Sequence, residues 1–292
     1  MKQHIKIGTR KSKLAMVQTE MVVKAIKKAE PDIEIELVPM TTMGDKVLDK
    51  PLESFGGKGA FISEFEDAMT TGKIDMAVHS AKDMPISLPE GLSILAVSLR
   101  EDPRDVLVTR KNCPLPEHGI VGTSSLRRQI QIEKLYPVLT KNLRGNVGTR
   151  LLKLQNQEYD GIILAAAGLK RLDLLRDQEY DFGYLDADSF IPAAGQGIIA
   201  IEGREDQTLQ TMLQFLNHTE SMYCLETERE VLKLLNAGCS EPVGVYSDID
   251  KDRITLRILY KYKDKVIRVK ETGAIEERFL LAQKLVNDIV NS

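Results

Sequence analysis

A short polar segment directly follows an apolar run that reads as a buried strand, Ile74 to Val78. The side chains that could do chemistry there are His79, Ser80, Lys82 and Asp83. Pro85 prevents the strand from continuing, because proline has no backbone N–H to donate to a sheet. In open α/β sheets ligands bind at the carboxyl ends of strands, so a carboxylate and an ammonium group at such an end could transfer protons and hold an anion. Taken alone, the segment is equally consistent with a turn that carries solvated charges.

A second group of residues favours anion binding. Between Val121 and Arg150 the sequence has six basic residues and one acid, Glu133, although the formal net charge of the 292-residue chain is only -3. Thr123–Ser125 would cap a helix that carries Arg127 and Arg128 in its first turn. Cations are unfavourable at that end of the helix dipole, and an anionic ligand bound by the hydroxyls, free N–H groups and guanidinium groups would offset the cost. A helix end that faces water is the alternative.

Other candidates for anion binding lie where expected strands lead into helices, a position where backbone N–H groups attract anions. They are Arg10, Ser12, Arg144, Gly145, Arg150 and Arg171. The glycines after Arg144 allow a close backbone approach, but the segment lacks the GxGxxG spacing and the lysine of a nucleotide-binding loop. The alternative to anion binding is that these residues form basic turns that face solvent.

The elements that must position these side chains follow an α/β pattern. The first forty residues read as a strand, an amphipathic helix that ends before Pro31, and a second strand, which is the unit of a mostly parallel sheet. A helix is expected over 61–69 and a Gly/Pro hinge over 191–197. Further strands are expected over residues 74–78, 92–97, 106–109, 119–122, 139–143, 161–165 and 198–201.

Three stretches indicate how the chain is divided. Residues 41–59 show no clear periodicity over a length that is more typical of a functional lid than of a plain connection. Residues 98–105 are charged and broken by a proline, as in a linker between domains. Beyond residue 217 the pattern becomes helix, three strands and helix, which predicts a small α+β domain with an antiparallel sheet. Cys239 lies in the first loop of that domain, and most cysteines in such loops have no role in chemistry.

Composition excludes several classes of protein. The chain is 42% hydrophobic and 28% charged, which is ordinary for a soluble globular protein, and no apolar run approaches the ~18 residues of a membrane span. The amino terminus lacks the apolar region of a secretory signal. Three cysteines without a CxxC pair indicate neither a disulfide framework nor a zinc site. We therefore expect a cytoplasmic protein with no metal and no nucleic-acid or membrane partner.

Several motifs in a fixed order make the chain resemble the porphobilinogen deaminase family, also called the hydroxymethylbilane synthases. They are Ile7–Ser12, Gly56–Gly59, Ala77–Asp83, Gly122–Arg128, Arg144–Arg150, Ala166–Arg171, Pro192–Gly197 and Gly238–Cys239. The resemblance covers essentially the whole chain. No single motif is decisive, but so many in register make a chance match very improbable.

The resemblance implies an α/β fold of three domains. Two are lobes that resemble periplasmic binding proteins of the second type, and the third is a small C-terminal α+β domain with an antiparallel three-stranded sheet. Domain 1 is expected over 1–98 and 196–217 and includes the lid loop 41–59. Domain 2 is expected over 102–192 and domain 3 over 218–292.

The resemblance also implies the activity. The protein would be a transferase of tetrapyrrole (heme) biosynthesis that condenses four porphobilinogen molecules head to tail with loss of ammonia. The chain of rings would grow on a dipyrromethane primer held by a thioether to Cys239. Hydrolysis would then release hydroxymethylbilane. Asp83 would be the catalytic acid and base, a task that suits a carboxylate. The cofactor would also contact Ser80, Lys82, Thr123, Ser124, Ser125, Arg127, Arg128, Arg144 and Gly145. The substrate would contact Arg10, Ser12, Phe61, Arg150 and Arg171. The family is typically monomeric.

The chain departs from the family pattern near the cofactor cysteine, where Ala237 and Ser240 stand in place of the usual Gly and Gln. Ala60 and Ala81 also replace larger apolar residues. The leading rival function is a two-lobed, non-catalytic binding protein or sensor for a small carboxylated ligand, which leaves Cys239 and Asp83 without a purpose. An enzyme that acts on phosphorylated substrates is a weaker rival, because no metal or phosphate motif is present.

Overall fold

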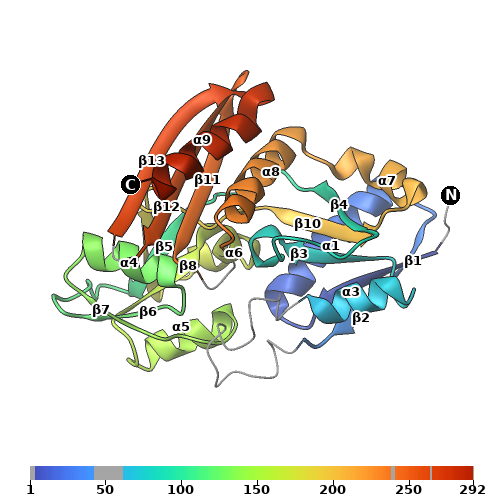
Figure 1. Cartoon of the computed structure of the whole chain (residues 1–292). Helices are drawn as coiled ribbons and strands as arrows, with labels where there is room; N and C mark the ends of the chain where they lie inside the picture. Colours follow the sequence, from blue (N-terminus) through green and yellow to red (C-terminus); the bar gives the residue numbers. More distant parts are fainter. Residues whose placement is uncertain (1–3, 43–61, 238–240, 264, 292) are drawn as a thin grey trace. The chain divides into compact units, whose positions relative to one another are not determined.

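The computed structural model describes residues 4–42, 62–237, 241–263 and 265–291 (Figure 1). The chain forms two compact units. Unit 1 contains residues 1–100 and 198–223, and unit 2 contains residues 101–197 and 224–292. The first change of unit, between Arg100 and Glu101, falls inside the charged stretch 98–105, and the second, between Gly197 and Ile198, falls at the end of the Gly/Pro hinge.

Unit 1 is built on a five-stranded sheet in the order β2-β1-β3-β10-β4. Its strands are β1 (His4–Arg10), β2 (Glu34–Met40), β3 (Met76–Ser80), β4 (Leu92–Val97) and β10 (Ile199–Arg204). Its helices are α1 (Lys13–Ala29), α3 (Ser63–Thr70), α7 (Gln207–Leu213), the first residues of α8 (Thr219–Leu234), and the short 3-10 helices η2 (Ala81–Asp83) and η4 (Gln214–Leu216). β1 pairs in parallel with β2 and β3, so the predicted strand, helix and strand unit is confirmed.

The first helix begins where the sequence predicts. Ser12 is its N-cap, and the Ser12 hydroxyl accepts a hydrogen bond from the Ala15 N–H over 3.3 Å. Val22 and Ile26 are buried on the sheet side of α1 and belong to the same core cluster as Ile5 and Ile7 of β1. This packing fixes the junction between β1 and α1, which carries Arg10 and Ser12.

β10 was predicted as a strand, but its place in the sheet was not. It lies between β3 and β4 and runs antiparallel to both. The register pairs Ile199 with Ser80 and Ala200 with His79, so a segment more than a hundred residues later in the chain flanks the polar end of β3. The Ile198 carbonyl also accepts the Ala81 N–H over 3.0 Å, which holds the start of η2.

Unit 2 contains a second five-stranded sheet in the order β7-β6-β8-β5-β9. Its strands are β5 (Asp105–Arg110), β6 (Ile120–Gly122), β7 (Leu139–Lys141), β8 (Gly161–Ala165) and β9 (Tyr180–Leu185). Its helices are α4 (Leu126–Leu135), α5 (Val147–Gln155), α6 (Ala166–Arg171) and the 3-10 helix η3 (Leu174–Arg176). β6 pairs in parallel with β7 and β8, whereas β5 is antiparallel to β8 and β9. β9 was not predicted, and β7 is shorter than the expected strand 139–143.

The C-terminal part of unit 2 confirms the predicted small α+β arrangement. β11 (Val243–Asp250), β12 (Arg253–Tyr262) and β13 (Lys265–Ala274) form an antiparallel sheet. The 3-10 helix η5 (Ile275–Glu277) leads into α9 (Arg278–Val290), whose Leu285 and Ile289 share one core cluster with Ile254 and Leu256 of β12.

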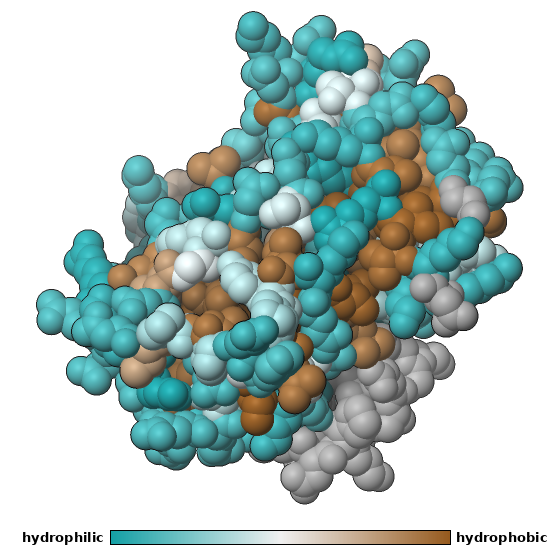
Figure 2. All heavy atoms as spheres, turned by 90° about the vertical axis from the view of Figure 1, so that its left-hand side faces the viewer, coloured by the Kyte–Doolittle hydropathy of each residue, from teal (hydrophilic) through white to brown (hydrophobic). Residues whose placement is uncertain are grey.

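On the face in Figure 2, hydrophobic side chains form a band in the upper half, flanked by hydrophilic ones.

Among the helices that the structure describes, none is long and apolar enough to cross a membrane.

Candidate active site

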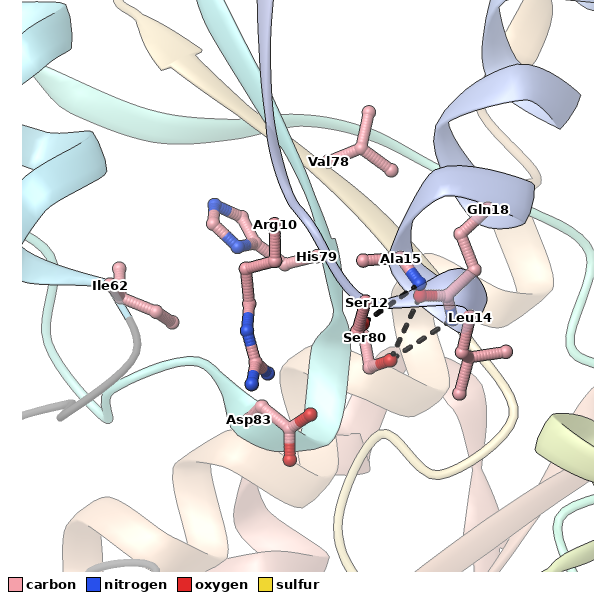
Figure 3. Close-up of a pocket in the computed structure, with 10 residues that line it drawn as sticks. All are labelled: Arg10, Ser12, Leu14, Ala15, Gln18, Ile62, Val78, His79, Ser80 and Asp83. Atoms are coloured by element: carbon pink, nitrogen blue, oxygen red, sulfur yellow. Dashed lines mark hydrogen bonds between the residues drawn. The ribbon is translucent and has the colours of Figure 1, made fainter. Parts of the chain in front are cut away.

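A pocket in unit 1 lies at the carboxyl end of β3, where the sequence predicts a site (Figure 3). It is lined by Arg10, Ser12, Leu14, Ala15, Gln18, Ile62, Val78, His79, Ser80 and Asp83. Four of the predicted site residues, Arg10, Ser12, Ser80 and Asp83, therefore meet in one place. Lys82 belongs to η2 between Ser80 and Asp83 but is not one of the lining residues.

Asp83 is held by the short helix that ends β3. The Met84 N–H donates to the Ala81 carbonyl over 3.2 Å, which closes the turn, and the Ala81 N–H donates to the carbonyl of Ile198, the residue before β10. Arg10, at the end of neighbouring β1, extends its guanidinium group toward Asp83 (Figure 3). A carboxylate and a guanidinium group on adjacent strand ends can together face a substrate that carries both an amine and carboxylates.

Gln18 is a pocket residue that the sequence analysis missed. Its side-chain Nε2 donates to the Ser80 hydroxyl over 3.0 Å (Figure 3). The signal was present, because Gln18 is a polar residue on the apolar face of α1 and is only 3% exposed. A buried amide is expected to have a hydrogen-bond partner, and here that partner is the predicted site hydroxyl.

His79 connects the pocket to a buried carboxylate. Its Nε2 lies 3.0 Å from Oε2 of Glu202 on β10, and its ring packs edge-on against Phe65 with 5.3 Å between ring centroids. Glu202 is fully buried. Nearby Glu66 on α3 has its pKa raised to about 7, first by burial and then by the negative charges of Glu202 and Asp67.

In unit 2, Arg127 and Arg128 are buried and bonded to a protein carboxylate. Nη1 of Arg127 lies 2.8 Å from Oδ2 of Asp105, and Nη2 of Arg128 lies 2.6 Å from Oδ1 of the same residue. The two side chains are 4% and 7% exposed. The sequence placed them correctly in the first turn of a helix but gave no sign of Asp105. Their contact with a cofactor stays a prediction.

The hydroxyl groups before α4 shape the loop that leads into it. The Ser124 hydroxyl donates to the Leu143 carbonyl over 2.6 Å, and the buried Thr123 hydroxyl accepts the Ser125 N–H over 3.2 Å. Ser125 is the N-cap, but its side chain makes no capping hydrogen bond. The N-terminus of α4 therefore keeps backbone N–H groups without a side-chain cap, beside two guanidinium groups.

The loop before α5 needs a glycine at position 145. Gly145 has φ +116°, and a Cβ there would lie 2.9 Å from Cγ2 of Thr149. The Gly145 carbonyl accepts Nε of Arg150 over 2.8 Å, and the Asn146 side chain caps the helix by accepting the Thr149 N–H. Arg144 is half-buried, and this burial lowers its pKa. The predicted residues at this loop are thus brought together by one glycine turn.

Arg171 bonds to the protein backbone. Its Nη2 donates to the Gly197 carbonyl over 2.6 Å, at the residue where the chain leaves unit 2. Burial lowers the pKa of Arg171, and the Glu101 carboxylate opposes that shift. Its contact with substrate stays a prediction. Phe61, Cys239 and the part of the lid loop from residue 43 lie outside the described residues.

Two family models match the chain. The model of the porphobilinogen deaminase dipyromethane cofactor binding domain matches residues 5–211, and that of the porphobilinogen deaminase C-terminal domain matches residues 222–291. A curated porphobilinogen deaminase of Acetivibrio thermocellus is 47% identical over 272 residues, which cover 92% of each chain.

Solved structures with a similar arrangement are more distant. The periplasmic VFT2 domain of Bordetella pertussis BvgS matches 72% of this chain and 85% of its own, with 15% identity and a TM-score of 0.44. The BenM effector binding domain, solved with its effector benzoate, matches 80% of this chain and 94% of its own, with 15% identity and a TM-score of 0.43. Structural similarity at this level says nothing about the activity of this chain.

Proposed function

Because this chain belongs to the porphobilinogen deaminase family, we propose that the pocket at the end of β3 is where it condenses porphobilinogen, with Asp83 as the acid and base. The enzymes of this family are hydroxymethylbilane synthases, transferases of tetrapyrrole biosynthesis that carry a dipyrromethane cofactor. The observation that carries the proposal is the meeting of Asp83, Arg10 and Ser80 in one pocket. The family match does not favour a non-catalytic sensor.

The residues of unit 2 fit the chemistry of the cofactor. When bound, dipyrromethane supplies a free pyrrole carbon on which the chain of rings grows, and its side chains are carboxylates. Arg127, Arg128 and Arg144 offer guanidinium donors, and the uncapped N-terminus of α4 offers backbone N–H groups. Nε of Arg128 is buried and has no hydrogen-bond partner among the described residues. Such a donor set fits carboxylates, and we assign the covalent attachment to Cys239 by family resemblance.

In the pocket of unit 1, each side chain has a task that suits its chemistry. The Asp83 carboxyl group would protonate the departing amine of porphobilinogen, face the positive charge that develops on the ring, and accept the proton lost after condensation. Arg10 would hold a substrate carboxylate beside Asp83, since its guanidinium group is permanently charged. Ser80 would donate or accept a hydrogen bond in an orientation set by Gln18.

Replacing Asp83 tests this assignment. Asp83→Asn keeps the size of the side chain but removes its proton transfer and its charge, so we expect turnover to fall by about 10²- to 10⁴-fold. We expect the purified variant still to carry its covalent cofactor or a bound chain, detected by intact mass. Asp32→Asn, an exposed acid in the turn before β2, is the matched control and should keep wild-type turnover. Wild-type turnover in Asp83→Asn would remove Asp83 from the mechanism.

We also propose that the chain works in the cytoplasm and as a monomer. Of the cysteines that the structure describes, Cys113 and Cys224 are both free thiols, which fits a reducing compartment. The monomeric state is proposed from the habit of the family. Light scattering on the purified protein should give a mass close to the 32.7 kDa of one chain, and a dimer mass would contradict the proposal.

A further inference from the structure

Arg127 and Arg128 share a single protein carboxylate. They are consecutive residues of α4, and consecutive side chains on a helix point about 100° apart. Both nevertheless reach Asp105, one at each carboxylate oxygen. Asp105 is the first residue of β5 and is 0% exposed. Such convergence requires both side chains to be held in fixed rotamers.

Each arginine has a second fixed contact. Nη1 of Arg127 also donates to the Ile191 carbonyl over 2.8 Å, and Nη1 of Arg128 donates to the Ile163 carbonyl over 2.9 Å. These two hydrogen bonds on each guanidinium group leave most of its five N–H donors for other acceptors. The pair is therefore rigidly held without being saturated.

Asp105 is itself held in place by Gln196. Nε2 of Gln196 donates to Oδ1 of Asp105 over 2.9 Å and to the Pro103 carbonyl over 2.7 Å. The carboxylate is thus fixed by the segment before β5 and by the segment that ends at Gly197. This arrangement resembles the outer ring of hydrogen bonds that orients ligand-binding side chains in other sites.

The charges in this cluster do not balance. Two guanidinium groups face one carboxylate, and among the described residues no other acid forms an ion pair with either arginine. Burial lowers the pKa of Arg127, Asp105 opposes that shift, and the neighbouring charge of Arg128 adds to it. One positive charge therefore remains in a buried place, where a ligand carboxylate would be bound more strongly than in water.

We propose that Asp105 is a positioning residue for the cofactor site, which fixes Arg127 and Arg128 together and leaves one positive charge for a carboxylate of the cofactor. The inference rests on the proposed function, because the ligand is the dipyrromethane that the family carries. It assigns to Asp105 an effect on cofactor loading rather than on the chemical step. Asp105 reaches the ligand only through the two arginines.

Two variants test this role. Asp105→Asn keeps the shape but removes the charge, and Asp105→Glu keeps the charge but moves the carboxylate by one methylene. The chains are purified without cofactor from a host that does not make porphobilinogen and are then incubated with porphobilinogen. The fraction that gains two pyrrole units is followed over time by intact mass. We expect both variants to load at least 10-fold more slowly than wild type, with circular dichroism unchanged for the folded fraction.

The control is Asp102→Asn, which removes a nearby carboxylate that pairs with Arg104 and not with the arginines of α4. It should load at the wild-type rate. If Asp105→Asn does not fold, the loading rate of Asp105→Glu alone tests the inference, because this variant preserves the charge balance of the cluster. Folded variants that are less stable but load like wild type would show that Asp105 is only structural and would overturn the inference. An unloaded wild-type chain would instead contradict the proposed function itself.

Discussion

At the scale of single residues, this protein buries several charged groups that must be compensated. Arg127 shows the effect of burial on a charged group. Burial lowers its pKa, and the Asp105 carboxylate at 2.8 Å raises it. Arg128 is compensated by the same residue, with its Nη2 2.6 Å from Oδ1 of Asp105. Removing one partner of such a buried pair leaves an uncompensated charge, so we expect substitutions at these residues to destabilise the fold.

Glu66 provides a pH-dependent prediction at this scale. Its pKa is about 7 in the folded chain against an ordinary 4.5, so between these values the folded chain binds more protons than the unfolded chain. Stability should therefore fall as the pH rises from 4.5 to 7. Glu66→Gln removes this penalty, and we expect its urea midpoint to exceed that of wild type at pH 8 and to match it near pH 4. Glu64→Gln on the same helix controls for the lost charge, and an equal difference at both pH values would contradict the assignment.

Sequence patterns indicated candidate site residues but not their hydrogen-bond partners. The strand end that carries Ser80 and Asp83 was predicted, because an apolar run followed by polar residues and a proline leaves few alternatives. The partners of Arg127 and Arg128 were not, because Asp105 lies 22 and 23 residues away along the chain. Gln18 was missed for a related reason, since its partner Ser80 is 62 residues distant.

At the scale of elements, tight turns place the basic residues. The turn at Gly145 connects β7 to α5 and brings Arg144 and Arg150 to one loop, with Arg150 bonded to the Gly145 carbonyl. In the same way, η2 places Asp83 three residues beyond the last residue of β3. In both cases a few backbone hydrogen bonds decide where a functional side chain lies.

Gly145→Ala tests the importance of the first turn. The substitution forces a non-glycine residue to φ +116° and puts a Cβ 2.9 Å from Thr149, so we expect a loss of about 1 to 3 kcal/mol in the free energy of unfolding. Gly148→Ala is the matched control three residues later. Its Cβ meets nothing closer than 3.5 Å and lies in a helix, where alanine is favoured over glycine by about 1 kcal/mol. Equal stability of the two variants in urea would contradict this reading of the loop.

The elements themselves were largely predictable, and their order in the sheets was not. Alternation and amphipathic spacing predicted β1, α1 and β2 and their parallel pairing, because the pattern is local. The antiparallel insertion of β10 depends on pairing with segments a hundred residues away, which no local period encodes. β9 has aromatic residues at alternating positions, Tyr180, Phe182 and Tyr184, and the sequence analysis did not use this strand signal.

At the scale of the whole molecule, the chain changes unit between 100 and 101, between 197 and 198, and between 223 and 224. Glu101 and Gly197, which lie at two of these points, are hydrogen-bonded to each other, because the Glu101 N–H donates to the Gly197 carbonyl. The same carbonyl accepts a hydrogen bond from Arg171, and the Glu101 carboxylate pairs with Lys170 at 2.8 Å. Unit 1 carries the proposed acid and base, and unit 2 carries the buried arginines. Proton transfer is therefore proposed for unit 1, and carboxylate binding by the buried arginines is proposed for unit 2.

The most direct test of the account is the intact mass of the denatured protein, purified from a host that makes porphobilinogen. We predict an excess over the sequence mass equal to two pyrrole units, which survives denaturation because it is covalent. The excess should persist in Cys113→Ser, which changes an exposed cysteine outside the proposed site, and disappear in Cys239→Ser. A wild-type chain with the unmodified mass, or a Cys239→Ser chain that keeps the excess, would contradict it.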